Sequence, residues 1–325
     1  MPVWWVTGAT GFLGQHVLSH LARRIHEHQS TEGDEASRIV ALVRRDSPLG
    51  IHSGGIEHVR LASGTEDDLR RAAEQAPPDY VIHCAGQTPP AAENELRRAN
   101  VEMTVNLLAA LRHLARPVRM VVAGSAAELG PVDADVLPVA EDYPCRPVDT
   151  YGRIKWEASR LVLEQLHPLE PIVARIFNPI GPGLSSKQAF GRFASQLLSS
   201  TSDPLTLRVG NLDARRDFVD IRDVANAMIT LAMAGRSRTV YHIGTGQSRR
   251  VGDGLNTLIR LSGRAIRLEI DADLGNTRGP SDSRADIRRI TRETGWEPKI
   301  PWEKSLTDLW NEAKARAECL RPVGR

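Results

Sequence analysis

The sequence has few cysteines, and their spacing forms no recognisable site. Only Cys84, Cys145 and Cys319 occur among 325 residues, far apart and without a CxxC pair. This distribution indicates neither a disulfide framework nor a zinc site built on thiolates. We therefore expect a reducing compartment and no bound metal.

Long hydrophobic runs and an excess of charge are missing as well. No apolar run approaches the roughly 18 residues that cross a bilayer, and the opening VWWV lacks the layout of a signal peptide. The 42 basic and 40 acidic side chains nearly cancel, so the chain lacks the dense positive field that attracts nucleic acid or anionic membranes. We expect a cytoplasmic protein with a small-molecule partner.

What is present is the pattern of an α/β protein. Short, mostly continuous apolar runs alternate with amphipathic helical stretches, which predicts strands covered on both faces. The predicted fold is a Rossmann-type, doubly wound parallel sheet. The predicted strands are Val3 to Thr7, Ile39 to Val43, Glu57 to Leu61, Tyr80 to Cys84, Val118 to Ala123 and Ile172 to Phe177.

A glycine-rich turn joins the first predicted strand to a helix. The run VTGATGFLGQHV, residues 6–17, places glycines at 8, 11 and 14, and a helix is predicted over Gln15 to Arg24. The N–H groups and dipole of a helix's first turn attract an anion, and glycine lets a pyrophosphate approach closely. A tight turn alone would also use these glycines. Their place after the first strand of such a sheet favours a bound dinucleotide.

The pattern changes after about Asn178, which predicts two regions. Residues 1–178 are expected to form the dinucleotide-binding domain, and residues 179–325 mostly a smaller α/β lobe that binds the substrate, with some segments returning to the main sheet. The polar stretch 26–37 predicts a long surface loop. In the second region we predict a strand at Val240 to Ile243 and helices near 221–234, 251–262 and 303–318.

A serine, a tyrosine and a lysine form the candidate catalytic cluster. Tyr151 and Lys155, in TYGRIKWEAS, share one face of a predicted helix. A phenol loses its proton near pH 10, and a nearby ammonium, helped by an oxidised nicotinamide ring, would stabilise the phenolate. Ser125, just beyond a strand, lies where such a fold places functional groups. A surface Tyr and Lys are a common pair without function, but the serine favours catalysis.

In the glycine-rich turn and in the serine, tyrosine and lysine, the sequence resembles the extended short-chain dehydrogenase/reductase family, a group of nucleotide-sugar epimerases, dehydratases and reductases. The likeness covers nearly the whole chain. Within the family, the part from RIFNPIGPG to YHIGTGQ is most similar to the GDP-4-keto-6-deoxy-mannose reductases. The matching motifs are TGATGFLG, VIHCAG at 81–86, Asn100, GSAAELG at 124–130, YGRIK, RIFNPIGPG at 175–183, RDFVDIRDVANAM at 216–228, YHIGTG at 241–246 and TGWEP at 294–298.

The resemblance implies roles for individual residues. Tyr151 would exchange the proton, Ser125 would orient the sugar oxygen, and Lys155 would tune the tyrosine while binding the nicotinamide ribose. Thr88 would lie beside the sugar. The residues implied to bind the dinucleotide are Gly8, Thr10, Gly11, Phe12, Leu13, Gly14, Cys84, Ala85, Gly86 and Asn100.

The resemblance also implies where the substrate's diphosphate and nucleoside bind. Asn178, Arg216 and Arg278 match the positions that hold them. A guanidinium suits phosphate because it presents a fork of donors and is less costly to desolvate than an ammonium. Surface ion pairs would be the other use of these arginines. The resemblance further implies a homodimer through the helices near 93–115 and 150–166.

The chain departs from the family pattern around the catalytic serine. Leu129 replaces the usual tyrosine and Gly124 the usual preceding serine, which predicts a reshaped sugar pocket. Dehydratases carry a glutamate in this motif. Counting back from the usual tyrosine puts Ala127 at that position, with Glu128 one residue later, which disfavours a dehydratase.

The second predicted strand bears on the choice of cofactor. An acidic residue at its end usually binds the ribose 2′-hydroxyl of NAD, whereas arginine accommodates the extra phosphate of NADP. Here the strand IVALV is followed by Arg44 and Arg45, with Asp46 slightly too late. We therefore favour NADP, and NAD stays open.

NADP use favours a net reductase, because epimerases keep their nicotinamide bound through each cycle. We expect hydride transfer from NADPH to the C4 carbonyl of a nucleotide-bound 4-keto-6-deoxy sugar, a step of deoxysugar biosynthesis, with Tyr151 giving the proton and Ser125 polarising the oxygen. One alternative is a nucleotide-sugar epimerase with tightly bound NAD. Another is a non-catalytic dinucleotide-binding sensor, which would have no need of the serine, tyrosine and lysine together.

Overall fold

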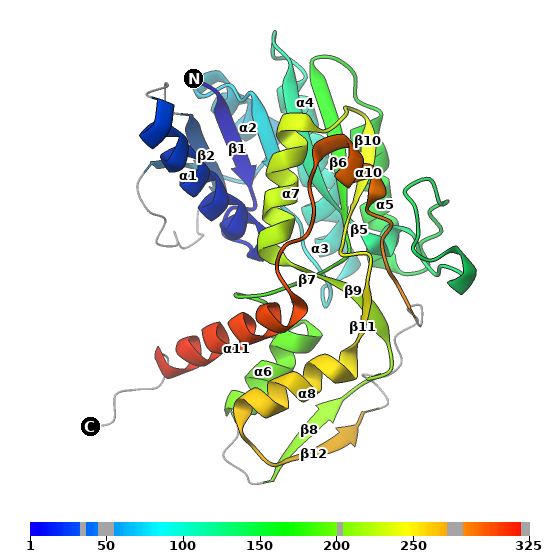
Figure 1. Ribbon diagram of the computed structural model, residues 1–325. Helices are drawn as coiled ribbons and strands as arrows, with labels where there is room; N and C mark the ends of the chain where they lie inside the picture. The colour runs from blue at the N-terminus through cyan, green and yellow to red at the C-terminus, as the bar shows by residue number, and fades with distance from the viewer. Residues whose placement is uncertain (33–36, 45–54, 200–203, 272–281, 320–325) are drawn as a thin grey trace.

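A seven-stranded parallel sheet forms the centre of the molecule (Figure 1). The computed structural model describes residues 1–32, 37–44, 55–199, 204–271 and 282–319. The strand order is β10-β6-β5-β4-β1-β2-β3, and every neighbouring pair is parallel. The predicted doubly wound sheet is therefore confirmed. Its strands are β1 (Val3–Thr7), β2 (Arg38–Arg44), β3 (Ile56–Leu61), β4 (Tyr80–His83), β5 (Val118–Ser125), β6 (Leu169–Ile176) and β10 (Thr239–Ile243).

Helices cover both faces of this sheet, which explains why its strands are apolar on both sides. The α3 helix (Glu93–Arg97) runs through a π-helical turn, Arg98–Glu102, into α4 (Met103–Leu111). One face is covered by α1 (Phe12–Glu32), α7 (Ile221–Ala234) and α10 (Arg288–Thr294), and the other by α2 (Glu66–Gln75), α4 and α5 (Thr150–Leu163).

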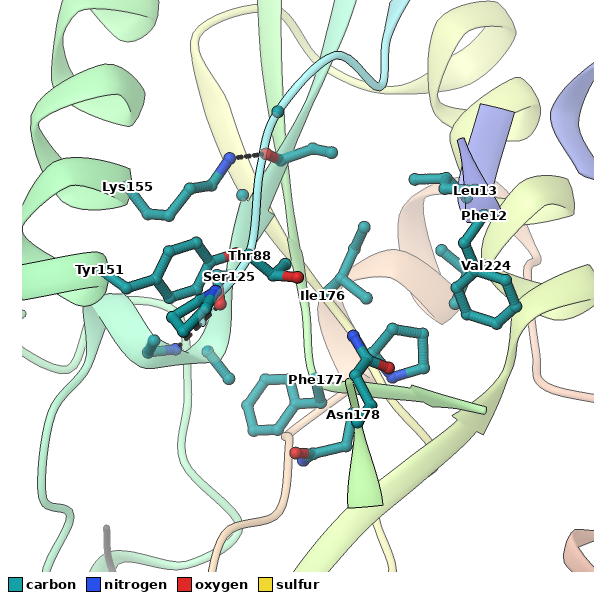
Figure 2. A pocket seen from close by; sticks show the side chains of 18 of the residues that line it. Phe12, Leu13, Thr88, Ser125, Tyr151, Lys155, Ile176, Phe177, Asn178 and Val224 are labelled. Atoms are coloured by element: carbon teal, nitrogen blue, oxygen red, sulfur yellow. Dashed lines mark hydrogen bonds between the residues drawn. The ribbon is translucent and has the colours of Figure 1, made fainter. Parts of the chain in front are cut away.

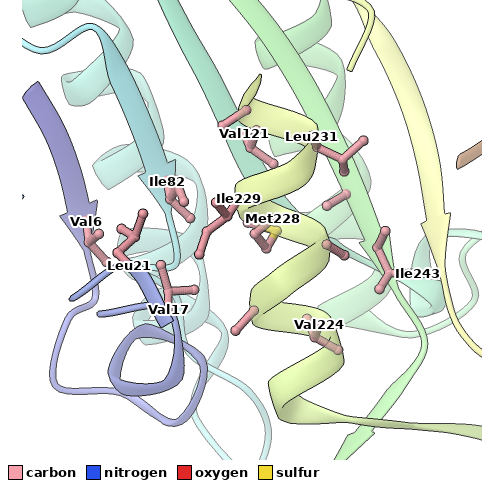
Figure 3. Packing of buried hydrophobic residues seen from close by; sticks show 14 of the residues in the cluster. Val6, Val17, Leu21, Ile82, Val121, Val224, Met228, Ile229, Leu231 and Ile243 are labelled. Atoms are coloured by element: carbon pink, nitrogen blue, oxygen red, sulfur yellow. The ribbon is translucent and has the colours of Figure 1, made fainter. Parts of the chain in front are cut away.

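The α7 helix occupies the middle of one face (Figure 3). Val224, Met228 and Leu231 recur at the spacing of one helix face, and all three are fully buried. In Figure 3 this face packs between Val17 of α1 and Ile243 of β10. Burying each such side chain contributes roughly 1.5–3 kcal/mol, so α7 stabilises the packing on the central strands of the sheet.

A second group of elements lies beyond the carboxyl ends of the strands and has its own hydrophobic cluster (Figure 1). Because β10 and α7 return to the main sheet, only part of the chain after residue 178 belongs to this group. The division into a dinucleotide domain and a substrate lobe stays a prediction. The elements are β7 (Asn178–Ile180), α6 (Ala189–Ser199), β8 (Leu205–Val209), β9 (Arg215–Asp220), β11 (Ser248–Arg250), α8 (Val251–Ser262), β12 (Ile266–Ile270) and α11 (Trp302–Cys319).

Two sequence-based expectations need correction. The predicted loop 26–37 begins too early, because α1 continues to Glu32. Glutamate, glutamine and histidine are tolerated in an exposed helix, so polar composition alone does not end one, and the first glycine is Gly33. Ser125 is the last residue of β5 rather than a residue beyond it. Among the described residues, no helix combines the length and apolar character needed to cross a membrane.

Candidate functional site

A cavity of about 700 Å³ opens where β1, β4, β5 and β6 reach their carboxyl ends (Figure 2). This is the edge at which open α/β sheets bind ligands. Most of the predicted site residues meet there. They are Gly11, Phe12, Leu13, Cys84, Ala85, Gly86, Thr88, Asn100, Ser125, Tyr151, Lys155, Asn178 and Arg216.

The glycine turn forms one wall of the cavity. Gly8 has a φ of +64°, and a Cβ there would lie 2.6 Å from the main-chain nitrogen of Ala85. A Cβ at Gly14 would overlap the Gly8 carbonyl oxygen, so α1 packs directly onto the end of β1. Gly8, Thr10 and Gly14 do not line the cavity themselves. Gly8 and Gly14 support the turn that brings Gly11, Phe12 and Leu13 to the surface of the cavity.

Helix α5 carries two of the three candidate catalytic side chains. Asp149 caps the helix, since its Oδ1 accepts a hydrogen bond from the Gly152 N–H at 2.7 Å. The helical spacing then turns Tyr151 and Lys155 to the same side, where both line the cavity. Figure 2 shows the Tyr151 ring close to Ser125, which reaches the cavity from the end of β5. We call Ser125, Tyr151 and Lys155 the Ser-Tyr-Lys cluster.

The Tyr151 phenol is protonated at neutral pH. Burial raises the pKa of Tyr151 to about 12, a hydrogen bond with Ser125 lowers it in part, and the negative charges of Glu128 and Asp149 raise it further. The expected effect of Lys155 on this phenol involves a bound nicotinamide ring and stays a prediction. The Lys155 ammonium donates a hydrogen bond to the Ala123 carbonyl oxygen at 2.6 Å, marked by a dashed line in Figure 2.

The Lys155 side chain is buried beside the end of β5. Burial lowers the pKa of the Lys155 ammonium, and the negative charge of Glu128 opposes this shift. The Ala123 carbonyl fixes the end of the lysine side chain beside the last residues of β5. This arrangement places a fixed hydrogen-bond donor on the cavity wall.

Asn100 holds the loop that follows β4. Its side-chain Nδ2 donates to the carbonyl oxygens of Gln87, at 3.0 Å, and Leu96, at 2.8 Å. The residue lies within the π-helical turn between α3 and α4, and such turns are frequent at functional sites. Nothing in the sequence pattern predicted this turn. Thr88, which lies directly before Pro89 in the loop after β4, lines the cavity.

The far wall comes from β9 and its neighbours. Arg216 and Phe218 alternate with Asp217 and therefore share the cavity face, whereas Asp217 is buried and accepts hydrogen bonds from the Thr245, Gly246 and Ala285 main chain. Burial lowers the pKa of Arg216. The sequence reasoning missed Phe218, although period-2 alternation in RDFVD would have found it. It also missed Phe190 of α6, for which the sequence offered no comparable pattern.

Three predicted positions lie outside this arrangement. Arg44 is the exposed last residue of β2 and does not line the cavity. Arg45 and Arg278 lie outside the described residues. Ala127 lines the cavity, whereas Glu128 is fully buried and does not line it.

Together the fold and the cavity define a class of enzyme. A doubly wound sheet with a glycine turn after β1 and a serine, tyrosine and lysine in one cavity is the arrangement of a dinucleotide-dependent enzyme. The sequence profile of the NAD dependent epimerase/dehydratase family matches residues 4–244, more than half of the chain. The protein belongs to this family and is an NAD(P)-dependent oxidoreductase or epimerase.

Two relatives and one solved structure are similar over nearly the whole chain. GDP-6-deoxy-D-mannose reductase from Pseudomonas aeruginosa is 30% identical over 322 residues, covering 96% of this chain and 97% of that protein. dTDP-6-deoxy-L-talose 4-dehydrogenase (NAD(P)(+)) from Kitasatospora kifunensis is 25% identical over 314 residues, covering 94% and 93%. The structure of RMD from Pseudomonas aeruginosa complexed with NADPH has a TM-score of 0.79 at 26% identity, covering 97% and 100%.

Proposed function

We propose that the protein is an NADPH-dependent reductase of a nucleotide-bound 4-keto-6-deoxy sugar, of the GDP-4-keto-6-deoxy-mannose type. The observation that carries this proposal is that Ser125, Tyr151 and Lys155 line one cavity together with the glycine turn. Carbonyl reduction needs a proton donor, and a phenol holds its proton at neutral pH. Similarity to a GDP-6-deoxy-D-mannose reductase supports the substrate class.

The residues present fit a nicotinamide dinucleotide. The first turn of the 21-residue α1 helix faces the cavity through Gly11, Phe12 and Leu13, so its N–H groups and dipole suit a pyrophosphate. Asn100 and Lys155 line the same cavity, and Figure 2 shows Lys155 on the side of Tyr151 and Ser125. When bound, NADPH supplies the hydride that reduces the carbonyl carbon.

The Ser-Tyr-Lys cluster completes the reduction. Ser125 donates a hydrogen bond to the C4 oxygen and polarises the carbonyl, and Tyr151 gives its phenolic proton to that oxygen as the alcohol forms. Lys155 is anchored to the Ala123 carbonyl oxygen and would hold the nicotinamide ribose of the bound cofactor. Thr88 lies beside the sugar.

The diphosphate and nucleoside bind toward the far wall. Arg216 supplies paired donors to phosphate, and its partial burial strengthens such charge-assisted bonds. Asn178 is oriented by its Nδ2, which donates to the Asp217 carbonyl oxygen at 3.2 Å. Arg278 is proposed for the same role from its place in the sequence.

NADP is proposed over NAD because of the end of β2. Arg44 is exposed there, where the ribose 2′-phosphate of NADP would be accommodated. The solved structure of RMD contains NADPH, in agreement with this choice. The dTDP-6-deoxy-L-talose 4-dehydrogenase carries both cofactors in its name.

The function is tested by following nicotinamide absorbance with purified protein. GDP-4-keto-6-deoxy-mannose should oxidise NADPH stoichiometrically, with a clear preference over NADH. A 4-epimerase with bound NAD is the second candidate, because the matching family includes epimerases. Co-purifying NAD with sugar interconversion and no net oxidation of NADPH would replace the reductase by the epimerase.

A homodimer is proposed through the surface of α4 and α5. Val105 on α4 is an exposed apolar residue, and Trp156 on α5 lies under the Arg160 guanidinium. Sedimentation equilibrium should give twice the chain mass. A monomer at micromolar concentration would contradict this assembly.

A further inference from the structure

Glu128 is a fully buried carboxylate directly behind the Ser-Tyr-Lys cluster. Its side chain is 0% exposed, although the preceding Ala127 lines the cavity. Glu128 Oε1 accepts hydrogen bonds from the Ser125 main-chain N–H at 2.8 Å and the Ser159 hydroxyl at 2.9 Å. Oε2 accepts one from Arg175 Nε at 3.0 Å. One carboxylate therefore connects the end of β5, helix α5 and strand β6.

The neighbouring Gly124 makes room for this carboxylate. A Cβ at Gly124 would lie 2.8 Å from Glu128 Oε1 and 2.9 Å from Val173 Cγ1. These contacts are closer than real Cβ atoms make, so a side chain at position 124 would require Glu128 or Val173 to shift. The glycine at 124 therefore suits the buried carboxylate in its present place.

Arg175 completes the network from the other side. Its side chain is 4% exposed, and its guanidinium also contacts His242 Nε2 and Cys145 Sγ, both at 3.2 Å. A buried ion pair gives little net stability, because desolvation of both charges offsets their attraction. Its advantage is a fixed geometry, and here that geometry includes the main chain of Ser125.

We propose that Glu128 is a positioning residue for the reduction, a role that rests on the proposed function. Its carboxylate holds the main-chain N–H of Ser125 against Ser159, which lies two turns after Tyr151 on α5. Ser125 also caps the short turn Ala126–Glu128, accepting the Ala127 N–H at 3.2 Å. Glu128 thereby sets the position of the Ser125 hydroxyl relative to the Tyr151 phenol.

Two variants separate positioning from stability. Glu128→Gln keeps an oxygen for the Ser125 N–H but leaves the buried Arg175 charge uncompensated, so Tm should fall while kcat stays close to the wild-type value. The double variant Glu128→Leu/Arg175→Gln carries neither charge but offers Ser125 no acceptor. Its Tm should be closer to the wild type, and its kcat should fall about 10- to 100-fold with the KM for NADPH unchanged.

The matched control is Glu170→Gln. Glu170 pairs with Arg119 at 3.0 Å at the opposite end of the same two strands. This variant should leave kcat unchanged. A kcat that follows Tm across the variants, or a double variant with wild-type kcat, would overturn the positioning role.

The positioning role and the proposed function fail in different ways. A wild-type protein that oxidises no NADPH with the keto sugar contradicts the function alone. The position of Ser125 in crystal structures of the wild type and the double variant then decides the role of Glu128 without turnover. An unchanged separation of the Ser125 hydroxyl and the Tyr151 phenol would overturn it.

Discussion

At the scale of single residues, the proposed reduction depends on the buried phenol of Tyr151. The pKa of Tyr151 is raised to about 12 mainly by burial, and Ser125 counteracts this only in part. Lys155 donates a hydrogen bond to the Ala123 carbonyl oxygen. The phenol holds a proton at neutral pH, as the proposed reduction requires.

Replacing this phenol should remove the proton donor and little else. Tyr151→Phe should lower kcat about 10²- to 10⁴-fold, since general acid catalysis contributes on this scale. The affinity for NADPH, measured by fluorescence titration, should remain. Tyr143→Phe is the control, because Tyr143 packs in the cluster around Leu129 and does not line the cavity. Equal turnover by Tyr151→Phe and the wild type would remove the tyrosine from the mechanism.

The arginine at the end of β2 should decide between the two cofactors. Arg44→Ala should raise the KM for NADPH about 10-fold and leave that for NADH nearly unchanged, because only NADPH carries the 2′-phosphate. Steady-state rates with both cofactors measure this. Arg38→Ala removes a guanidinium at the other end of the same strand, where it pairs with Glu57, and should change neither KM. A similar loss for both cofactors would argue against 2′-phosphate recognition.

At the scale of elements, α7 carries much of the core although it lies far along the chain from β1. Its buried face packs on α1 and on the strands at the centre of the sheet (Figure 3). Asp220 ends β9 and caps α7, so the strand that carries Arg216 and Phe218 on the cavity wall continues directly into this helix. Met228 and Met233 of α7 do not line the cavity, so changes at these two positions should affect stability rather than turnover.

Two methionines on α7 test this. Met228→Ala should lower the free energy of unfolding by about 2–5 kcal/mol, since Met228 is fully buried and its loss leaves a cavity. Met233→Ala, on the same helix with 46% of its surface exposed, should change stability little. Urea denaturation followed by circular dichroism measures both. Comparable losses for the two variants would contradict the packing of α7.

At the scale of the whole molecule, buried histidines should make the fold sensitive to mild acid. Burial lowers the pKa of His83 and of His242 to about 3. In the folded state these two histidines therefore stay unprotonated, whereas in the unfolded chain they bind protons below about pH 6.5. Their stabilisation is complete above that pH and is lost as the pH falls toward 3.

We expect the free energy of unfolding to fall by up to about 1.4 kcal/mol per pH unit for each histidine between pH 6 and pH 5. Carboxyls with raised pKa, such as Asp217 and Glu141, oppose this at lower pH because the folded state then binds their protons more readily. His242→Gln should reduce the slope, whereas His113→Gln, at an exposed position, should not. A stability that does not change from pH 7 to pH 5 would contradict the histidine contribution.

The local sequence pattern predicted the sheet and many of the adjacent helices, because buried parallel strands are continuous apolar runs with amphipathic helical stretches between them. The six strands predicted for the first half were all found, with ends shifted by up to three residues. The end of α1 was not predictable, because polar residues suit an exposed helix as well as a loop. The π-helical turn at Asn100 was not predictable either, since its hydrogen bonds reach to the loop after β4.

The sequence by itself determined the doubly wound sheet, the glycine turn and the spacing that puts Tyr151 and Lys155 on one helix face. These features depend on residues close together in the chain. Only the tertiary structure decided which polar groups from distant parts of the chain meet. Glu128 contacts Arg175 across 47 residues, and Lys155 reaches the Ala123 carbonyl across 32. The pKa of Tyr151 follows from such distant neighbours and from burial, which no local pattern contains.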